Sequence, residues 1–103
     1  MYVEDFVEIL TRLSATSEND LINIGAGGEF TIRHFAELIC KKVDYDFNKI
    51  QFDTSRYVGA KSKCLNTDKL KGLLPGLQLT SLEEGLGKTI DWFWGEKEKL
   101  LRI

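Results

Sequence analysis

Apolar residues recur at helical spacing in three stretches of the chain, and polar residues fill most positions between them. An apolar side chain every three or four residues lies on one face of a helix. Thr31 precedes the second stretch as a suitable N-cap, and Ser81 with Glu84 forms a capping box before the third. We therefore expect three amphipathic helices. Their apolar faces are Tyr2, Phe6, Ile9, Leu10 and Leu13, then Ile32, Phe35, Ala36, Ile39 and Val43, and then Leu82, Leu86, Ile90 and Phe93.

Two shorter stretches have the pattern of strands. Residues 21–25, "LINIG", are almost wholly apolar, which is typical of a short strand buried on both faces. Residues 48–53, "NKIQFD", alternate well enough to form a second strand. Because a helix is expected between the two strands, a parallel arrangement is favoured. Residues 66–76, "NTDKLKGLLPG", indicate a short fourth helix that Gly72 and Pro75 would stop.

These elements predict an α/β fold, a small mixed helix/strand domain with about two short parallel strands and four helices. A chain of 103 residues is one domain at most, so a single domain is expected over residues 1–103. Two strands alone make a poor sheet, and the apolar segment 21–25 is expected to need neighbours that this chain does not supply.

Net charge, the length of apolar runs and the number of cysteines exclude some classes of protein and indicate a compartment. The formal net charge of −2 argues against a general nucleic-acid binder, which would carry a basic excess. No apolar run approaches the roughly 18 residues needed to cross a bilayer. Residues 1–10 carry three acids and no basic start, so they do not resemble a signal peptide. Two cysteines, Cys40 and Cys64, are too few for a disulfide scaffold or a zinc site. We expect a cytoplasmic protein with no metal and with two reduced, buried and inert thiols.

A glycine-rich turn at residues 25–30 invites comparison with the dinucleotide-binding pattern G-x-G-x-x-G. Gly25 and Gly27 fit the first two positions, but Phe30 stands where a glycine or alanine allows close packing of helix on strand. The favoured interpretation is a strand-to-helix connection with glycines at positive φ, and no cofactor-binding residue is assigned.

A second motif, Tyr57-x-x-x-Lys61, matches the proton-transfer pair of short-chain dehydrogenases. That chemistry needs a helix, because residues four apart then share one face and the lysine lowers the pKa of the tyrosine. Here Gly59 lies inside the motif, and the surrounding residues are typical of a polar loop. We interpret the match as a coincidence and assign no catalytic residue.

Four blocks of the sequence, in order, resemble the extended short-chain dehydrogenase/reductase enzymes that act on nucleotide sugars, the NAD-dependent epimerase/dehydratase family, and among them the GDP-L-fucose synthases. "YVEDFVEIL" is similar to the family's "hVDD" segment and the helix that follows it. "INIGAGGEFTIRHFAELI" is similar to "NVGxGxxxTIRELAE". "FDTSRYVGAKSKCLNTDKL" resembles "FDxSKPDGxxRKxLDxxRL", and "SLEEGLGKTIDWFW" resembles "SLEEGLxxTYxWF". The resemblance covers almost the whole chain.

This resemblance implies that the chain is the C-terminal, substrate-binding part of such an enzyme. The Rossmann domain, with the NADP(H) loop and the catalytic Ser/Tyr/Lys set, would then be absent from these 103 residues. The function implied is binding of a nucleotide sugar, a GDP-sugar in the synthases, as a portion of an epimerase/reductase that is not catalytic by itself. The alternative is a non-enzymatic interaction module that pairs with itself or with a separate Rossmann subunit.

The resemblance also implies where a sugar diphosphate would bind, because the family's C-terminal part supplies basic side chains that neutralise it. Lys63 matches the lysine of the family's "RK", whereas Ser62 replaces the arginine. Lys61 could substitute as a point charge, although without the bidentate geometry of arginine. Arg56 matches the lysine of "SKPDG", and Lys49 falls where a substrate-contacting basic residue is expected. The alternative interpretation of these four cations is a solvated basic loop.

Overall fold

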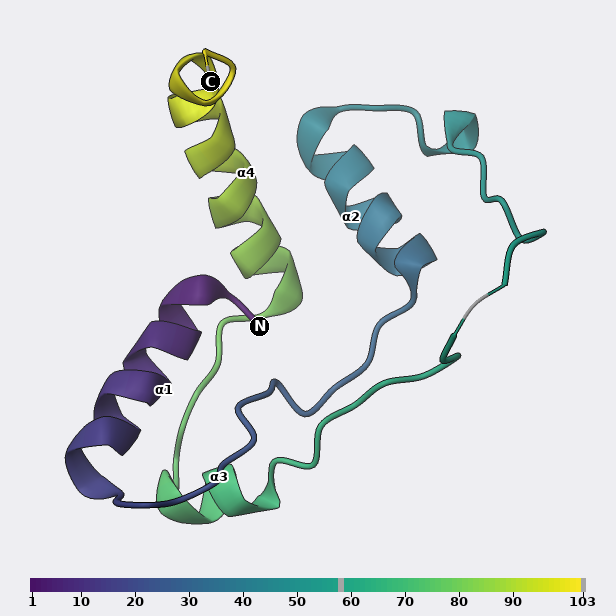
Figure 1. Ribbon diagram of the computed structural model, residues 1–103. Helices are drawn as coiled ribbons and strands as arrows, with labels where there is room; N and C mark the ends of the chain where they lie inside the picture. The colour runs from purple at the N-terminus through teal and green to yellow at the C-terminus, as the bar shows by residue number, and fades with distance from the viewer. Residues whose placement is uncertain (58, 103) are drawn as a thin grey trace. The chain divides into compact units, whose positions relative to one another are not determined.

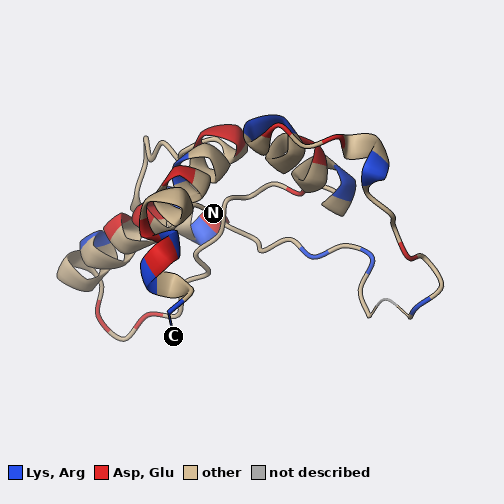
Figure 2. Ribbon diagram, turned by 90° about the horizontal axis from the view of Figure 1, so that it is seen from above, with Lys and Arg blue, Asp and Glu red and all other residues tan. Residues whose placement is uncertain are grey.

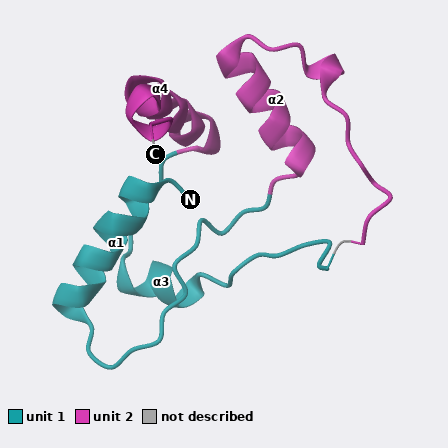
Figure 3. Cartoon of the chain, turned by 45° about the horizontal axis from the view of Figure 1, so that its top comes forward, with its two compact units in different colours: residues 1–29, 58–80 teal, residues 30–57, 81–103 magenta. Residues whose placement is uncertain are grey.

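The computed structural model describes residues 1–57 and 59–102. Its helices, drawn in Figure 1, are α1 (Val3–Thr16), α2 (Ile32–Val43), the 3₁₀-helix η1 (Phe47–Lys49), α3 (Asp68–Leu73) and α4 (Leu82–Leu100). The chain divides into two compact units, coloured in Figure 3. Unit 1 contains residues 1–29 and 58–80, and unit 2 contains residues 30–57 and 81–103.

The predicted α/β fold is wrong, because residues 1–57 and 59–102 contain helices and irregular segments but no strand. In the segment 21–25, Ile22 and Ile24 pack partly buried against the core of unit 1, whereas Leu21 is 91% exposed. Burial thus alternates along this segment as it would in a strand. Because a strand is stable only when it is hydrogen-bonded to a partner strand, and the described residues supply none, the segment forms no strand.

The second predicted strand, residues 48–53, begins inside η1 instead. The Asp46 carboxylate accepts a hydrogen bond from the Asn48 N–H (2.9 Å), which caps this 3₁₀ turn. An Asp side chain that bonds the backbone two residues on competes with extended structure. The remaining residues of the stretch take no regular secondary structure.

The helices predicted from periodicity are confirmed, and so is most of their capping. The Thr31 hydroxyl accepts from His34 N at 3.1 Å, and the Ser81 hydroxyl accepts from Glu84 N at 3.2 Å. Only this half of the capping box is observed, since the Glu84 carboxylate pairs with Lys88 Nζ at 2.9 Å. Helix α3 continues through Gly72 to Leu73, so Gly72 does not stop it.

The core of unit 1 joins α1 to α3. Ile9 is 0%, Leu13 6% and Leu70 2% exposed, and these three side chains pack together. Around them lie partly buried residues from the loops and the end of α3, namely Ile22, Ile24, Leu74, Leu77 and Leu79. At the start of α1 the Asp5 carboxylate accepts from both the N–H and the hydroxyl of Thr80, each at 2.8 Å. This pair fixes the end of unit 1 to its first helix.

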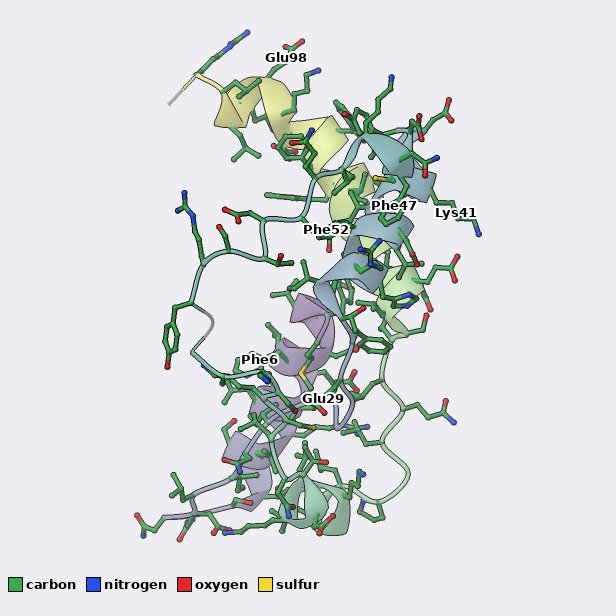
Figure 4. The ribbon with its side chains drawn as sticks, turned by 90° about the vertical axis from the view of Figure 1, so that its right-hand side faces the viewer. Phe6, Glu29, Lys41, Phe47, Phe52 and Glu98 are labelled. Carbon is green, nitrogen blue, oxygen red and sulfur yellow. The ribbon has the colours of Figure 1, made fainter. Side chains whose placement is uncertain are left out.

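In unit 2, α2 packs on α4 and on η1. Cys40 is the buried residue of α2, and Lys42 Nζ reaches Asp91 on α4 at 3.1 Å. The Arg33 guanidinium lies 4.4 Å from the ring centroid of Phe52 and 5.8 Å from that of Phe47, two rings labelled in Figure 4. Such cation–π contacts anchor the segment after α2 to that helix.

Both units leave apolar side chains exposed that the helical pattern predicts to be buried. On α1, Phe6 (41%) and Leu10 (51%) are exposed, and on α2 Ile32 is 76% exposed. Cys64 is an exposed free thiol, so the prediction of two buried thiols holds only for Cys40. Periodicity identifies the apolar face of a helix, but not whether a neighbouring element covers it. No helix in the described part of the chain is long and apolar enough to cross a membrane.

Asp5→Ala should destabilise unit 1, because two hydrogen bonds from Thr80 to a carboxylate are lost. We expect unfolding in urea, followed by circular dichroism, to show a loss of about 1.5–3 kcal/mol. Glu4→Ala, which removes the same charge at an exposed neighbouring position, should change stability by less than about 0.5 kcal/mol. Equal effects of the two substitutions would contradict a specific anchor at Asp5.

Candidate functional site

The four predicted substrate-binding cations lie in the stretch from η1 to the residues before α3. Figure 2 colours all Lys and Arg positions of the described chain blue. Lys49 is the last residue of η1 and Arg56 follows in the same unit, whereas Lys61 and Lys63 belong to the other unit. All four are exposed. The predicted cluster is therefore divided between the two units as two pairs.

Arg56 already has an anionic partner. Its Nε lies 3.2 Å from Asp53 Oδ2, and Asp53 Oδ1 accepts from the N–H (3.0 Å) and the hydroxyl (2.5 Å) of Ser55. The Ser55 hydroxyl lowers the pKa of Asp53 most, followed by the Ser55 N–H. Desolvation opposes these two effects, and the hydrogen bond with Arg56 makes the smallest contribution, which again lowers the pKa. Since the pKa is below its ordinary value, Asp53 is ionised at neutral pH, and a ligand must compete with it for Arg56.

Lys61 and Lys63 flank a residue that is tied to the glycine-rich turn. The Ser62 hydroxyl donates a hydrogen bond to Oε1 of Glu29, which follows Gly28 directly and is labelled in Figure 4. The resemblance predicts an arginine at the position of Ser62. In this chain the position carries no positive charge and instead forms a hydrogen bond to Glu29. Within unit 1, this hydrogen bond links the segment between the two lysines to the glycine-rich turn.

The segment that follows Ser62 runs alongside the glycine-rich turn within unit 1. Asn23 Nδ2 donates to the Asn66 carbonyl at 3.3 Å. A methyl group added at Gly25 would lie 3.2 Å from the Leu65 side chain, tighter than most real contacts. Gly25 therefore serves close packing of one chain segment on another, a role that sequence reasoning missed. The glycine spacing alone was a signal of close approach, but not of what approaches.

Gly27 agrees with the prediction of glycines at positive φ, since its φ is +75°. Among the described residues Gly76 is the other such glycine, whereas Gly25 and Gly28 do not have positive φ. The turn thus uses its glycines for two different reasons, conformation at Gly27 and contact at Gly25.

The Tyr57-x-x-x-Lys61 motif lacks the geometry that proton transfer requires. Tyr57 is 93% exposed, and residues 57 and 59–61 are not helical, while Val58 lies outside the described residues. The two ends of the motif also belong to different units. These observations agree with interpreting the match as a coincidence. In residues 1–57 and 59–102 there is also no group of three or more side chains suited to holding a metal ion.

No protein-family model matches the chain, and no solved structure matches it. Curated proteins do. The chain is 38% identical over 96 residues to a GDP-L-fucose synthase of Sinorhizobium fredii, a match that covers 90% of the chain and 29% of that protein. It is 36% identical to the GDP-L-fucose synthase of Escherichia coli, over 76% of the chain and 24% of the relative. UDP-glucuronic acid decarboxylase 1 of Danio rerio is 35% identical, over 94% of the chain and 23% of the relative.

The chain thus spans less than a third of the length of these relatives. The matches extend over the helices of both units, since they cover up to 94% of the chain. The resemblance predicted from the sequence is confirmed: over about 90% of its length this chain is homologous to the GDP-L-fucose synthases and to related sugar epimerases and reductases of the short-chain dehydrogenase/reductase type.

Proposed function

We propose that this chain is the nucleotide-sugar-binding portion of an NDP-sugar epimerase/reductase, that its ligand is a GDP-sugar, and that it is not catalytic by itself. The observation that carries the proposal is the match, over 90% of the chain, to proteins named for the synthesis of GDP-L-fucose. The missing length of those relatives would supply a Rossmann domain with NADP(H), either in the same polypeptide or as a separate subunit.

The charge pattern supports diphosphate binding at Lys61 and Lys63. Both ammonium groups are exposed, and the backbone between them is held by the bond from Ser62 to Glu29. Holding a backbone in place reduces the conformational entropy that binding must overcome. Arg56 and Lys49 belong to the other unit and would act there as further point charges, with Arg56 released from Asp53 when a ligand binds.

The absence of catalysis follows from the chemistry that reduction requires. Transfer of a hydride to a keto sugar needs a bound nicotinamide and a group that donates a proton to the oxygen. The exposed, non-helical Tyr57 segment is unsuited to the second task. We also propose the cytoplasm as the compartment, because a reducing environment would keep Cys40 and Cys64 as free thiols.

A second candidate function, a non-enzymatic interaction module, is favoured by one surface of α1. Val3 (63%), Phe6 (41%), Val7 (55%) and Leu10 (51%) are all exposed and follow the spacing i, i+3, i+4, i+7. This α1 stripe is one continuous apolar helix face, of the kind that binds a partner. It would fit a Rossmann subunit or a second copy of the chain. A stable dimer in light scattering, together with no response to any nucleotide, would favour this function over the first.

The first test is an amide-NMR titration with GDP, then UDP, with NADPH as a control. We expect a dissociation constant on the order of millimolar, about −4 kcal/mol, because part of a site binds weakly. The shifts should centre on residues 61–63. Lys63→Gln should weaken binding, whereas Lys99→Gln, an exposed lysine near the end of α4, should not. A spectrum that ignores every nucleotide would contradict the proposal.

Asp53→Asn should strengthen GDP binding, since it removes the carboxylate that competes for Arg56. We expect the dissociation constant to fall by up to about fivefold, the range of an exposed ion pair. Asp44→Asn makes the same charge change in the same unit, at a left-handed position that asparagine tolerates. If both variants bind GDP equally well, net charge rather than Arg56 is responsible.

The chain should not oxidise NADPH in the presence of a GDP-4-keto-sugar. The measurement is the absorbance of NADPH over time, at protein concentrations far above those used for an active enzyme. Turnover that persists through repurification would overturn the assignment as a non-catalytic portion.

A further inference from the structure

The second half of α4, the helix labelled in Figure 1, leaves large apolar side chains in water. Phe93 is 41%, Trp94 54% and Leu101 73% exposed. Leu101 follows the helix directly and keeps helical backbone angles, with φ −78° and ψ −8°, so the helical surface continues through it. The rings of Phe93 and Trp94 contact each other, with their centroids 5.7 Å apart. All of these residues belong to unit 2, and none of them is part of the α1 stripe or of the four cations discussed above.

The spacing of these residues places them along one face of the helix. At intervals of four, three and four residues stand Ile90, Trp94, Lys97 and Leu101, which we call the α4 seam. With 3.6 residues per turn these positions fall within about 60° around the helix, and such intervals are typical of the line along which two helices pack. Lys97 suits the seam because its Nζ lies 4.8 Å from the centroid of the Trp94 ring and its stem covers apolar surface.

Helix α2 packs on the first half of α4 and leaves the second half uncovered. Lys41 Nζ lies 4.0 Å from Glu83, and Lys42 Nζ lies 3.1 Å from Asp91. These contacts fall within residues 83–91, whereas the α4 seam continues to residue 101. The lengths agree, since 12 residues of α2 span about 18 Å and 19 residues of α4 about 28 Å. More than half of the Trp94 side chain therefore remains exposed.

The α4 seam is complementary to a second copy of itself. If two copies pack antiparallel about the midpoint between Trp94 and Lys97, Trp94 of each copy meets Lys97 of the other. An ammonium is attracted to the face of an indole ring, more strongly when water is excluded. In the same alignment Ile90 of each copy meets Leu101 of the other, so two aliphatic contacts close the ends of the seam.

The flanks of the seam agree with this alignment. On one side Phe93 comes level with the partly buried Leu100 of the second copy, which makes an apolar flank. On the other side Arg102 comes within one turn of Asp91 of the second copy. The Arg102 side chain is 81% exposed and lies 3.9 Å from Glu98, so it can reach a second carboxylate. Residues 90–102 contain three acids and three bases, so two copies of the segment do not repel each other.

We propose that two copies of the chain associate through their α4 seams in an antiparallel dimer. A second copy is favoured over another kind of partner because every seam and flank group finds its complement on the same sequence after a two-fold rotation. The contact covers only about three helical turns, at the small end of specific interfaces, so the dimer is weak. The proposal is independent of nucleotide binding and uses a surface different from the α1 stripe.

The first test is sedimentation equilibrium of the 103-residue chain in the presence of a reductant. We expect a monomer–dimer equilibrium with a dissociation constant of about 10–100 µM. Leu101→Glu should raise this constant at least about tenfold, because it places a charge opposite Ile90 in an apolar contact. Since Leu101 is 73% exposed, the circular dichroism spectrum should not change.

Two matched substitutions locate the interface. Leu21→Glu makes the same exchange at a position of unit 1 that is 91% exposed, and it should leave the dissociation constant within about twofold. Val7→Glu introduces the same charge in the α1 stripe, and it should also have little effect on the dimer.

The antiparallel direction is tested with disulfides in chains that also carry Cys64→Ser. A mixture of Ile90→Cys and Leu101→Cys chains should form a cross-linked pair on air oxidation, seen on a gel without reductant. Leu101→Cys alone should not cross-link, because the two positions 101 would lie about 16 Å apart along the helices, too far for a disulfide.

The proposal is overturned if the chain remains monomeric up to about 1 mM, or if Leu101→Glu affects the dimer no more than Leu21→Glu does. Loss of the dimer in Val7→Glu alone would assign the contact to the α1 stripe instead. Preferential cross-linking of Leu101→Cys to itself would exclude the antiparallel alignment. None of these results bears on the GDP titration, so the two proposals fail separately.

Discussion

The contact of Leu70 with Ile9 and Leu13 holds unit 1 together, and most features of this unit depend on it. Helix α3 has only 6 residues, too few to be stable alone in water. Burial of Leu70 to 2% exposure against α1 supplies the stabilisation that the short helix lacks. Once α3 is fixed, Lys69 reaches back to Asp20, Thr67 lies under the glycine-rich turn, and Lys71 lies beside Gly27.

The glycine-rich turn shows how one property, a missing Cβ, serves different ends. In a dinucleotide-binding loop the bare backbone lets a pyrophosphate approach. Here it lets Leu65 approach Gly25 and Thr67 approach Gly27, so the neighbour is another part of the same chain. A glycine pattern therefore indicates close approach, and the neighbouring residues decide what comes close.

The sequence predicts the helices well because helix formation is largely local. Periodicity identified α1, α2 and α4, and the hydroxyls of Thr31 and Ser81 cap the helices as expected. Strands depend on partners elsewhere in the chain, and residues 21–25 show the pattern without the partner. The exposure of Ile32 and Cys64 was missed for the same reason, since burial depends on what lies opposite.

The candidate site was predictable only as a set of charges. The family's spacing points to Lys49, Arg56, Lys61 and Lys63, but no local pattern marks the boundary between units, which separates Arg56 from Lys61. Nor does any pattern reveal that Asp53 engages Arg56 or that Ser62 is tied to Glu29. These contacts arise from tertiary structure or from loop geometry that propensity does not encode.

The difference in exposure between the two cysteines has a practical consequence. Cys40 is buried in α2, whereas the Cys64 thiol is accessible and adjoins Lys63 in sequence. A thiol reactive toward water-soluble reagents must be exposed, so a maleimide dye would label Cys64 and spare Cys40. The native sequence thus carries a single attachment point for a fluorophore next to its basic segment. Anisotropy or quenching of that dye would follow events at residues 61–63 without any engineered cysteine.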